Sequence, residues 1–168
     1  ISNNTIELLT IGKTQFALKI DADSKSNTIV NNFLSNYSIG LLLSSSENTI
    51  QSNTINNNEY GVKVDEGYDN KFENNTIKDS DTYSVWMLDN SSNNSFWNNS
   101  VTSVDSSSID FYVVESSTDN YLVNTPFSTI SVDGSSDLLL REYVVLDVND
   151  ASGDNMSGID IKVMEDDT

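Results

Sequence analysis

The chain has 168 residues, of which 26 are acidic and eight are basic, and its net charge is −18. This length suits one domain, or one domain with part of another, and the hydrophobic share of 36% is low for a globular protein, which predicts a thin core. Nucleic acid and anionic membranes are excluded as expected partners, because both bind basic surfaces. Cations remain candidate partners.

The chain contains no Cys and no His, which excludes disulfides, thiol chemistry and histidine-based proton transfer. No apolar run reaches the roughly 18 residues that a membrane span requires. The sequence opens at Ile1 in the middle of a repeat and stops after an acidic run. We therefore expect a mature or trimmed piece of a longer protein.

In chain order, one set of three short extended segments recurs with steps of 21, 22, 24 and 26 residues. Each set has two phrases that begin with Asn, five residues apart, and a run in which apolar residues alternate. The first phrase begins at Asn27, Asn48, Asn70, Asn94 and Asn120, and the second at Asn4, Asn32, Asn53, Asn75 and Asn99. The alternating runs span residues 16–20, 39–43, 60–64, 83–87 and 109–113, with a weaker copy at 128–132.

The spacing of these segments predicts an all-β solenoid. Gaps of about five residues leave no room for crossover helices, and the signals of tight hairpins are missing. Each segment is therefore expected to pair in parallel with its copy in the next coil. The predicted inward columns are Leu18, Leu41, Val62, Val85, Phe111; Ile20, Leu43, Val64, Met87, Val113; Ile29, Ile50, Phe72, Phe96, Leu122; and Ile6, Leu34, Ile55, Ile77, Val101.

The Asn that opens each phrase is interpreted as a structural residue. Asn tolerates left-handed backbone angles at corners better than most residues. Its amide can also hydrogen-bond to the Asn one coil away, as in stacked strands.

The pattern Asn-x-Ile-x-x-Asn-x-Ile, followed by Gly and alternating apolar residues, resembles the repeat of pectate-lyase-like and NosD-like proteins over about residues 2–133. This resemblance implies a single-stranded right-handed parallel β-helix, here of about five to six coils with a short C-terminal β segment. It also suggests a microbial surface protein. The copper binding attributed to NosD-like proteins is not expected, because His and Cys are absent and the three Met residues are isolated.

The repeat pattern stops after Asp137, so we divide the chain into residues 1–137 and residues 138–168. The second part has two alternating runs, near 142–148 and 159–164. Thirty residues are too few for a complete domain. Three explanations remain open: a cap on the last coil, the start of an Ig-like β-sandwich, or a strand that pairs with a neighbouring subunit.

The outward positions show no complete catalytic set. Families that resemble this fold and cleave acidic polysaccharides use Arg or Lys with bound Ca²⁺, or clustered Asp residues. Here Arg141 lies outside the repeats, and Leu42 separates Lys19 from Lys63 in one outward column. We therefore predict that the chain is not an enzyme, with a polysaccharide lyase or hydrolase as the alternative.

Calcium is the one metal that the sequence suggests, and no cofactor is required. Acidic and amide side chains alternate in the segment 147–154, and such hard oxygen ligands suit Ca²⁺. The alternative is a solvated acidic loop that favours solubility. The candidate ligands are Asp147, Asn149, Asp150 and Asp154.

Two aromatic residues mark the predicted contact site. By the alternation, Trp86 and Tyr112 point outward on adjacent coils, about 5 Å apart. Paired aromatic rings suit a sugar platform, and they equally suit a subunit contact or a position beneath a loop. Sequons for N-glycosylation begin at Asn3, Asn36, Asn74, Asn90, Asn93, Asn98 and Asn155.

Together these features predict an extracellular or cell-surface protein that is structural or adhesive: a unit of a surface layer, filament or adhesin. Its expected partners are copies of itself or other surface proteins, bound through the solenoid ends, because unpaired strands are exposed there. The alternative is a carbohydrate-binding or polysaccharide-lyase-like protein that acts on glycans.

Overall fold

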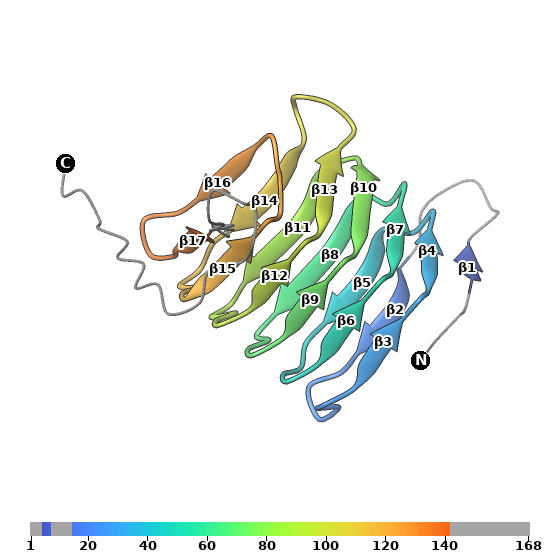
Figure 1. Ribbon diagram of the computed structural model, residues 1–168, viewed down its shortest axis with the longest axis horizontal. Helices are drawn as coiled ribbons and strands as arrows, with labels where there is room; N and C mark the ends of the chain where they lie inside the picture. The colour runs from blue at the N-terminus through green and yellow to red at the C-terminus, as the bar shows by residue number, and fades with distance from the viewer. Residues whose placement is uncertain (1–4, 8–14, 142–168) are drawn as a thin grey trace, which may run out of the picture.

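The computed structural model describes residues 5–7 and 15–141, and all regular structure in these ranges is β-strand. Successive strands enter three sheets in turn up to β15, and the last two described strands, β16 and β17, extend only two of these sheets. The coils follow one another along the long axis, from the blue N-terminal end to the orange C-terminal end of the described chain (Figure 1). The predicted β-solenoid, of about five turns, is confirmed.

The three sheets are named A, B and C. Sheet A contains β3 (Thr28–Val30), β6 (Thr49–Gln51), β9 (Lys71–Glu73), β12 (Ser95–Trp97), β15 (Asn120–Val123) and β17 (Leu138–Arg141). Sheet B contains β1 (Thr5–Glu7), β4 (Phe33–Ser35), β7 (Thr54–Asn56), β10 (Thr76–Ser80) and β13 (Ser100–Ser103). Sheet C contains β2 (Phe16–Ile20), β5 (Ile39–Leu43), β8 (Tyr60–Asp65), β11 (Tyr83–Leu88), β14 (Ile109–Val113) and β16 (Ile130–Val132).

Strand pairing follows the register that the repeats predict. Every pairing among the described strands is parallel. Ile50 of β6, for example, lies opposite Ile29 of β3 and Phe72 of β9. The weak sixth run is also in register, since Ile130 lies opposite Phe111. Leu138–Arg141 continues sheet A beside β15, and the remainder of the predicted C-terminal segment lies outside the described residues.

The core is one side chain deep and runs along the solenoid axis. Most members of the four predicted columns are fully buried, and Leu18 is partly buried against them. Phe72 and Phe96 stack with their ring centroids 4.4 Å apart. Each fully buried side chain of this size contributes about 1.5–3 kcal/mol, which allows a chain with few apolar residues to keep its fold.

Two ladders of buried Asn residues line the corners on either side of sheet A. The Nδ2 of Asn48 donates to Oδ1 of Asn70 (3.0 Å), and the same bond joins Asn53 to Asn75 (3.0 Å). The predicted ladder is therefore present. The prediction about backbone angles is wrong by one residue, because the left-handed residue precedes the ladder Asn, as at Asp69 (φ 56°) before Asn70. The exposed residue makes the turn, which leaves the Asn side chain free to point inward.

A bend at the start of sheet C interrupts the simple alternation. Gly61 and Ser84 are buried although the next residue in each strand also faces the core. A Cβ at Gly61 would lie 2.5 Å from the Ser84 carbonyl oxygen, so close approach of the coils requires glycine. Two consecutive inward residues turn the preceding residues, Tyr60 and Tyr83, to the outside.

The same column ends in a buried acid. Asp110 is fully buried, and its carboxylate accepts hydrogen bonds from the backbone N–H of Ser103 (2.7 Å), Ser128 (2.6 Å) and Thr129 (3.2 Å). The Ser103 hydroxyl donates a fourth (2.7 Å). The acid therefore ties the end of β13 to the turn before β16.

No helix in the described ranges is long and apolar enough to cross a membrane.

Candidate functional site

The outer face of sheet C carries an aromatic cluster, which consists of Tyr60, Tyr83, Trp86, Tyr112 and Lys63. The ring centroid of Trp86 lies 5.2 Å from that of Tyr60 and 5.6 Å from that of Tyr83. Tyr83 in turn stacks on Tyr112 at 4.3 Å. All four rings are half-buried. They come from β8, β11 and β14, so the cluster extends over three consecutive coils.

The lysine of this cluster, Lys63, lies over one of its rings. Lys63 Nζ lies 4.7 Å from the centroid of the Trp86 ring, a cation–π contact, and 2.8 Å from a carboxylate oxygen of Asp65. Both charged side chains are partly buried. Trp86 Nε1 is also buried, and no hydrogen-bond partner for it is present in the described structure. The cluster therefore combines ring surfaces with a fixed cation and an unsatisfied N–H donor.

The hydroxyl of Tyr60 stays protonated near neutral pH. Burial raises the pKa of Tyr60, and the negative charge of Glu59 raises it further, with a smaller contribution from Tyr83. A neutral phenol donates a hydrogen bond. A hydrogen bond to Glu59 also raises the pKa of Tyr60, so a bound molecule would have to compete with Glu59 for the single O–H of Tyr60.

The two predicted contact residues lie together. Trp86 and Tyr112 are opposite each other in the pairing of β11 with β14, and both are half-buried. The sequence analysis missed Tyr60 and Tyr83, because strict alternation places them in the core. The signal that could have found them is the small residue that follows each one, Gly61 and Ser84. Leu42, predicted to point outward, is 8% exposed, so the outward column is partly covered.

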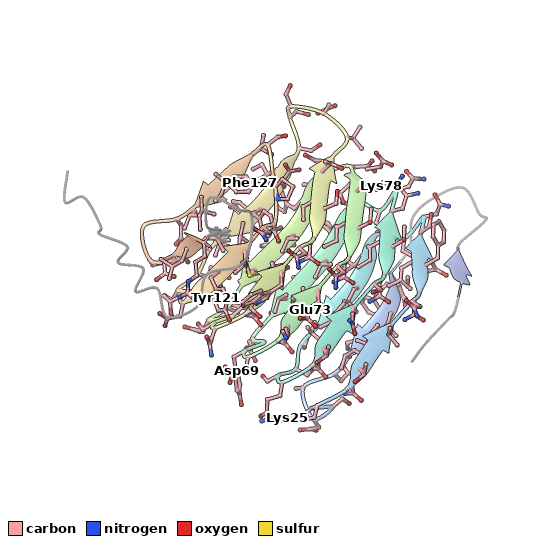
Figure 2. The ribbon with its side chains drawn as sticks, in the orientation of Figure 1. Lys25, Asp69, Glu73, Lys78, Tyr121 and Phe127 are labelled. Carbon is pink, nitrogen blue, oxygen red and sulfur yellow. The ribbon has the colours of Figure 1, made fainter. Side chains whose placement is uncertain are left out.

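A hollow lies over sheet A, and we call it the sheet A hollow. It has a volume of about 470 Å³ and is lined by Asn93, Asp119, Tyr121, Leu139 and Arg141. The Arg141 guanidinium lies 4.3 Å from the centroid of the Tyr121 ring. Figure 2 shows Tyr121 near the C-terminal end of the described coils, well away from Lys25. The hollow thus combines an aromatic ring with polar and charged groups.

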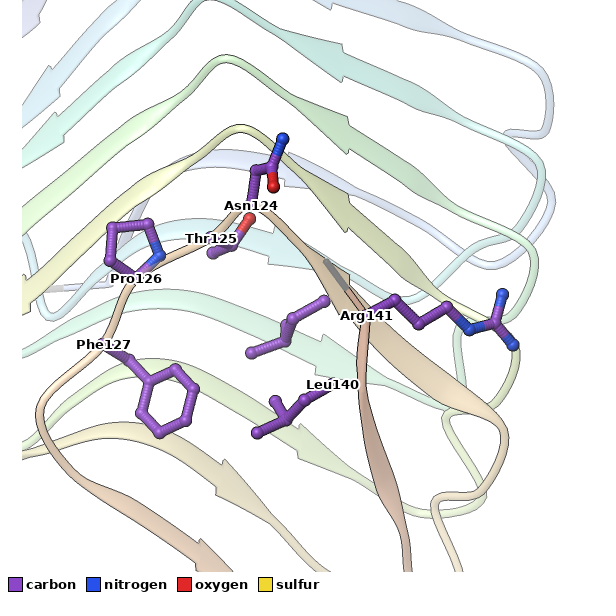
Figure 3. A pocket seen from close by; sticks show the side chains of 7 residues that line it. Asn124, Thr125, Pro126, Phe127, Leu140 and Arg141 are labelled. Atoms are coloured by element: carbon purple, nitrogen blue, oxygen red, sulfur yellow. The ribbon is translucent and has the colours of Figure 1, made fainter. Parts of the chain in front are cut away.

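A separate cavity, of about 330 Å³, opens inside the last described coils. Figure 3 shows Phe127 and Leu140 pointing into this space from opposite sides, whereas Arg141 points away from it. Asn124, Thr125 and Pro126 complete its labelled rim. The side chains that face one another here are apolar, so the cavity offers little for chemistry.

The predicted calcium ligands, Asp147, Asn149, Asp150 and Asp154, lie outside the described residues. Within residues 5–7 and 15–141, no group of three or more acidic side chains could hold a metal ion.

The sequons occupy corners where they are described. Asn74, Asn90, Asn93 and Asn98 are exposed and left-handed, and Asn36 is left-handed and half-buried. The Nδ2 of Asn93 donates to Asp69, and Asn57 donates to Asn36. Asn3 and Asn155 lie outside the described residues.

The comparisons with known proteins agree with this fold. The chain belongs to the right-handed β-helix family, whose region matches residues 1–101. The solved structure of the periplasmic alginate epimerase AlgG is similar, with a TM-score of 0.66 and 17% identity over 87% of this chain and 39% of that chain. A point mutant of AlgG gives 0.65 and 16%, over 85% and 39%. This chain therefore spans about two fifths of that epimerase, and no curated protein sequence matches it.

The prediction that the chain is not an enzyme is wrong. It rests on the position of Arg141 outside the repeats and on the separation of Lys19 from Lys63 by Leu42. The same fold, over most of this chain, belongs to an epimerase, so the solenoid does not define a scaffold protein. The enzymatically active domain of a bacteriophage CBA120 tailspike protein gives a TM-score of 0.41 and 9% identity over 85% of this chain and 26% of that one, a likeness too weak to bear on function.

Proposed function

We propose that this protein acts on glycans and that the aromatic cluster of sheet C holds the polysaccharide. The observation that carries the proposal is the gathering of four rings on one outer face, across three consecutive coils. Sugar rings have apolar faces that pack on aromatic side chains. The strands are spaced by about 4.8 Å, so the cluster offers a strip rather than a single contact.

Polar groups at the strip suit the hydroxyls of a sugar. The buried Trp86 N–H has no hydrogen-bond partner among the described residues, and leaving such a donor unsatisfied costs about 1–3 kcal/mol. Because this nitrogen has almost no accessible surface, a sugar hydroxyl would recover that energy only if a neighbouring side chain moved aside on binding. Lys63 supplies a positive charge that Asp65 holds in place.

The alginate epimerase has the same fold, so this fold is compatible with an enzyme that acts on a polysaccharide. It favours conversion of the glycan rather than binding alone, and an extracellular or envelope-associated location is part of the proposal. The role in a surface layer, filament or adhesin, with copies meeting through the solenoid ends, stays a prediction from the sequence.

The test compares wild type with Tyr83→Ala, because Tyr83 contacts three other members of the cluster. Tyr68→Ala is the matched control, since Tyr68 is 42% exposed and lies outside the cluster. Binding to alginate, galacturonan and cellulose oligomers is measured by calorimetry, and thermal unfolding verifies that each variant folds.

We expect Tyr83→Ala to weaken binding at least about fivefold, as for a central aromatic contact, and Tyr68→Ala to have no effect. Proton NMR of the incubated polymer detects epimerisation or cleavage. The proposal fails if wild type neither binds nor converts any glycan, or if both variants bind equally well.

A further inference from the structure

The sheet A hollow is built by three neighbouring elements. Tyr121 and Leu139 lie opposite each other in β15 and β17, and Arg141 follows two residues after Leu139 in β17. Asn93 and Asp119 are the left-handed corner residues before β12 and β15, with φ of 54° and 57°. The ladder register therefore fixes these side chains around one space of about 470 Å³.

Arg141 differs from every other cation in the described part of the chain. It forms no ion pair with any described residue, although its guanidinium is held over the Tyr121 ring. Each described lysine, by contrast, has a carboxylate oxygen within 4 Å; these are Lys19, Lys25, Lys63, Lys71 and Lys78. In a protein with a net charge of −18, a guanidinium that is held in place and has no carboxylate partner among the described residues is a candidate anion-binding group.

The chemistry of the hollow limits the anion. A planar guanidinium binds a carboxylate through two parallel hydrogen bonds. The Asn93 amide and the Asp119 carboxylate line the same space and suit hydroxyl groups, while Leu139, 45% exposed, offers an apolar surface. Ligands of high charge density are disfavoured by the net charge of the protein, so one anionic group per ring fits best.

We propose that the sheet A hollow is a second glycan-binding site, selective for an acidic sugar whose carboxylate pairs with Arg141. Tyr121 holds the guanidinium in place, and the sugar hydroxyls contact Asn93 and Asp119. The site lies on a different sheet from the aromatic cluster, and it does not depend on the function proposed for that cluster.

The sequence contains a single Arg, which gives a direct probe. In the full chain labelled with ¹⁵N-arginine, one Nε–Hε resonance reports on Arg141. We expect oligogalacturonate to shift this resonance and neutral galacto-oligosaccharide to leave it unchanged. Sodium acetate at the same carboxylate concentration should cause a much smaller shift.

Variants then test the contact itself by calorimetry with oligogalacturonate, each in the Tyr83→Ala background, which weakens binding at the aromatic cluster. Arg141→Gln should weaken this binding at least tenfold, because a charged hydrogen-bonded pair is lost, and Arg141→Lys should recover only part of it. Lys71→Gln is the matched control, because Lys71 lies on the same outer face and already pairs with Glu73 at 2.8 Å; it should change little.

The proposal is overturned if the resonance does not move, if acetate or the neutral sugar moves it equally, or if Arg141→Gln binds as well as its Tyr83→Ala parent. Tyr83→Ala should leave the Arg141 shift intact. A failure of the aromatic cluster can therefore be distinguished from a failure of this site.

Discussion

Replacing Asn70 by Ala removes the middle rung of the first ladder. Asn70 is 1% exposed. Its amide donates to the Ser45 carbonyl (2.9 Å) and to Asn94 Oδ1 (3.0 Å). Its own Oδ1 accepts from the backbone N–H and from the Nδ2 of Asn48, both at 3.0 Å. The substitution therefore deletes four hydrogen bonds in the interior.

The magnitude follows from the groups that are left without a partner. Asn94 Oδ1 keeps the bond from the Asn70 N–H, and Asn48 Nδ2 keeps its bonds to Ser45 Oγ and the Ser46 carbonyl. The Asn48 backbone N–H and the Ser45 carbonyl lose the bonds described. Each unsatisfied buried group costs about 1–3 kcal/mol, so we expect a loss of about 2–6 kcal/mol in the free energy of unfolding.

Urea unfolding, followed by far-UV circular dichroism, measures this loss as a shift of the midpoint at constant slope. The control is Asn74→Gly. Asn74 is an exposed corner residue with φ 53°, a conformation that glycine adopts without strain, so its effect should stay within about 0.5 kcal/mol. A loss below about 1 kcal/mol for Asn70→Ala, or an equal loss in the control, would refute the reasoning.

Three further predictions concern single residues of sheet C and of the turn that follows it. Gly61→Ala should destabilise the fold by about 1–3 kcal/mol through overpacking, whereas Gly134→Ala, whose Cβ would meet nothing within 4 Å, should be neutral in the same urea assay. Asp110→Ala should cost at least about 3 kcal/mol, because three backbone N–H groups lose their acceptor and each such loss costs about 1–3 kcal/mol; a midpoint close to that of wild type would contradict this. Hydrogen bonds from the Glu115 N–H, and then from Ser136 and Ser135, lower the pKa of Asp133 to about 2. Since this folded-state pKa lies below the usual 3.8, the stabilisation is present above pH 4 and disappears as the pH falls through 2. Asp133→Asn should therefore lower the urea midpoint at pH 5 more than at pH 2, and carbon NMR should place the titration near 2.

The register and the core could be read from the sequence, because the Asn phrases keep their phase in every coil. Ile50 and Ile55 face the core since their phrase fixes both corners of one coil. The ladder itself followed from the known behaviour of stacked amides. The backbone angle of the ladder Asn could not be assigned correctly, because a left-handed turn is equally open to the residue before it, as Asp69 shows.

The candidate sites were harder to predict, because they depend on how side chains meet across coils. Trp86 and Tyr112 follow from alternation, but Tyr60 and Tyr83 join them only through the bend at Gly61 and Ser84. A bend changes the face of every residue before it, and no period of two can express that.

Arg141 shows the same difficulty. Its strand lacks the Asn phrase that marks the start of the other strands of sheet A, so the sequence pattern places the end of the repeats after Asp137, before this strand. Its position over Tyr121 depends on the pairing of β15 with β17, and the sequence pattern does not predict this pairing.

The Asn ladders also have a direction. In each rung the amide of one coil donates to the carbonyl of the following coil, from Asn27 to Asn48 and onward to Asn120. In the second ladder Thr125 takes the last place: its hydroxyl accepts from the backbone N–H of Asn99 and donates back to the Phe96 carbonyl of the preceding coil. The side-chain dipoles thus add along the axis, so whole coils can be duplicated or deleted while a reversed coil cannot join. New residues enter at the loops and on the outer faces, where binding surfaces can diverge without disturbing a single rung.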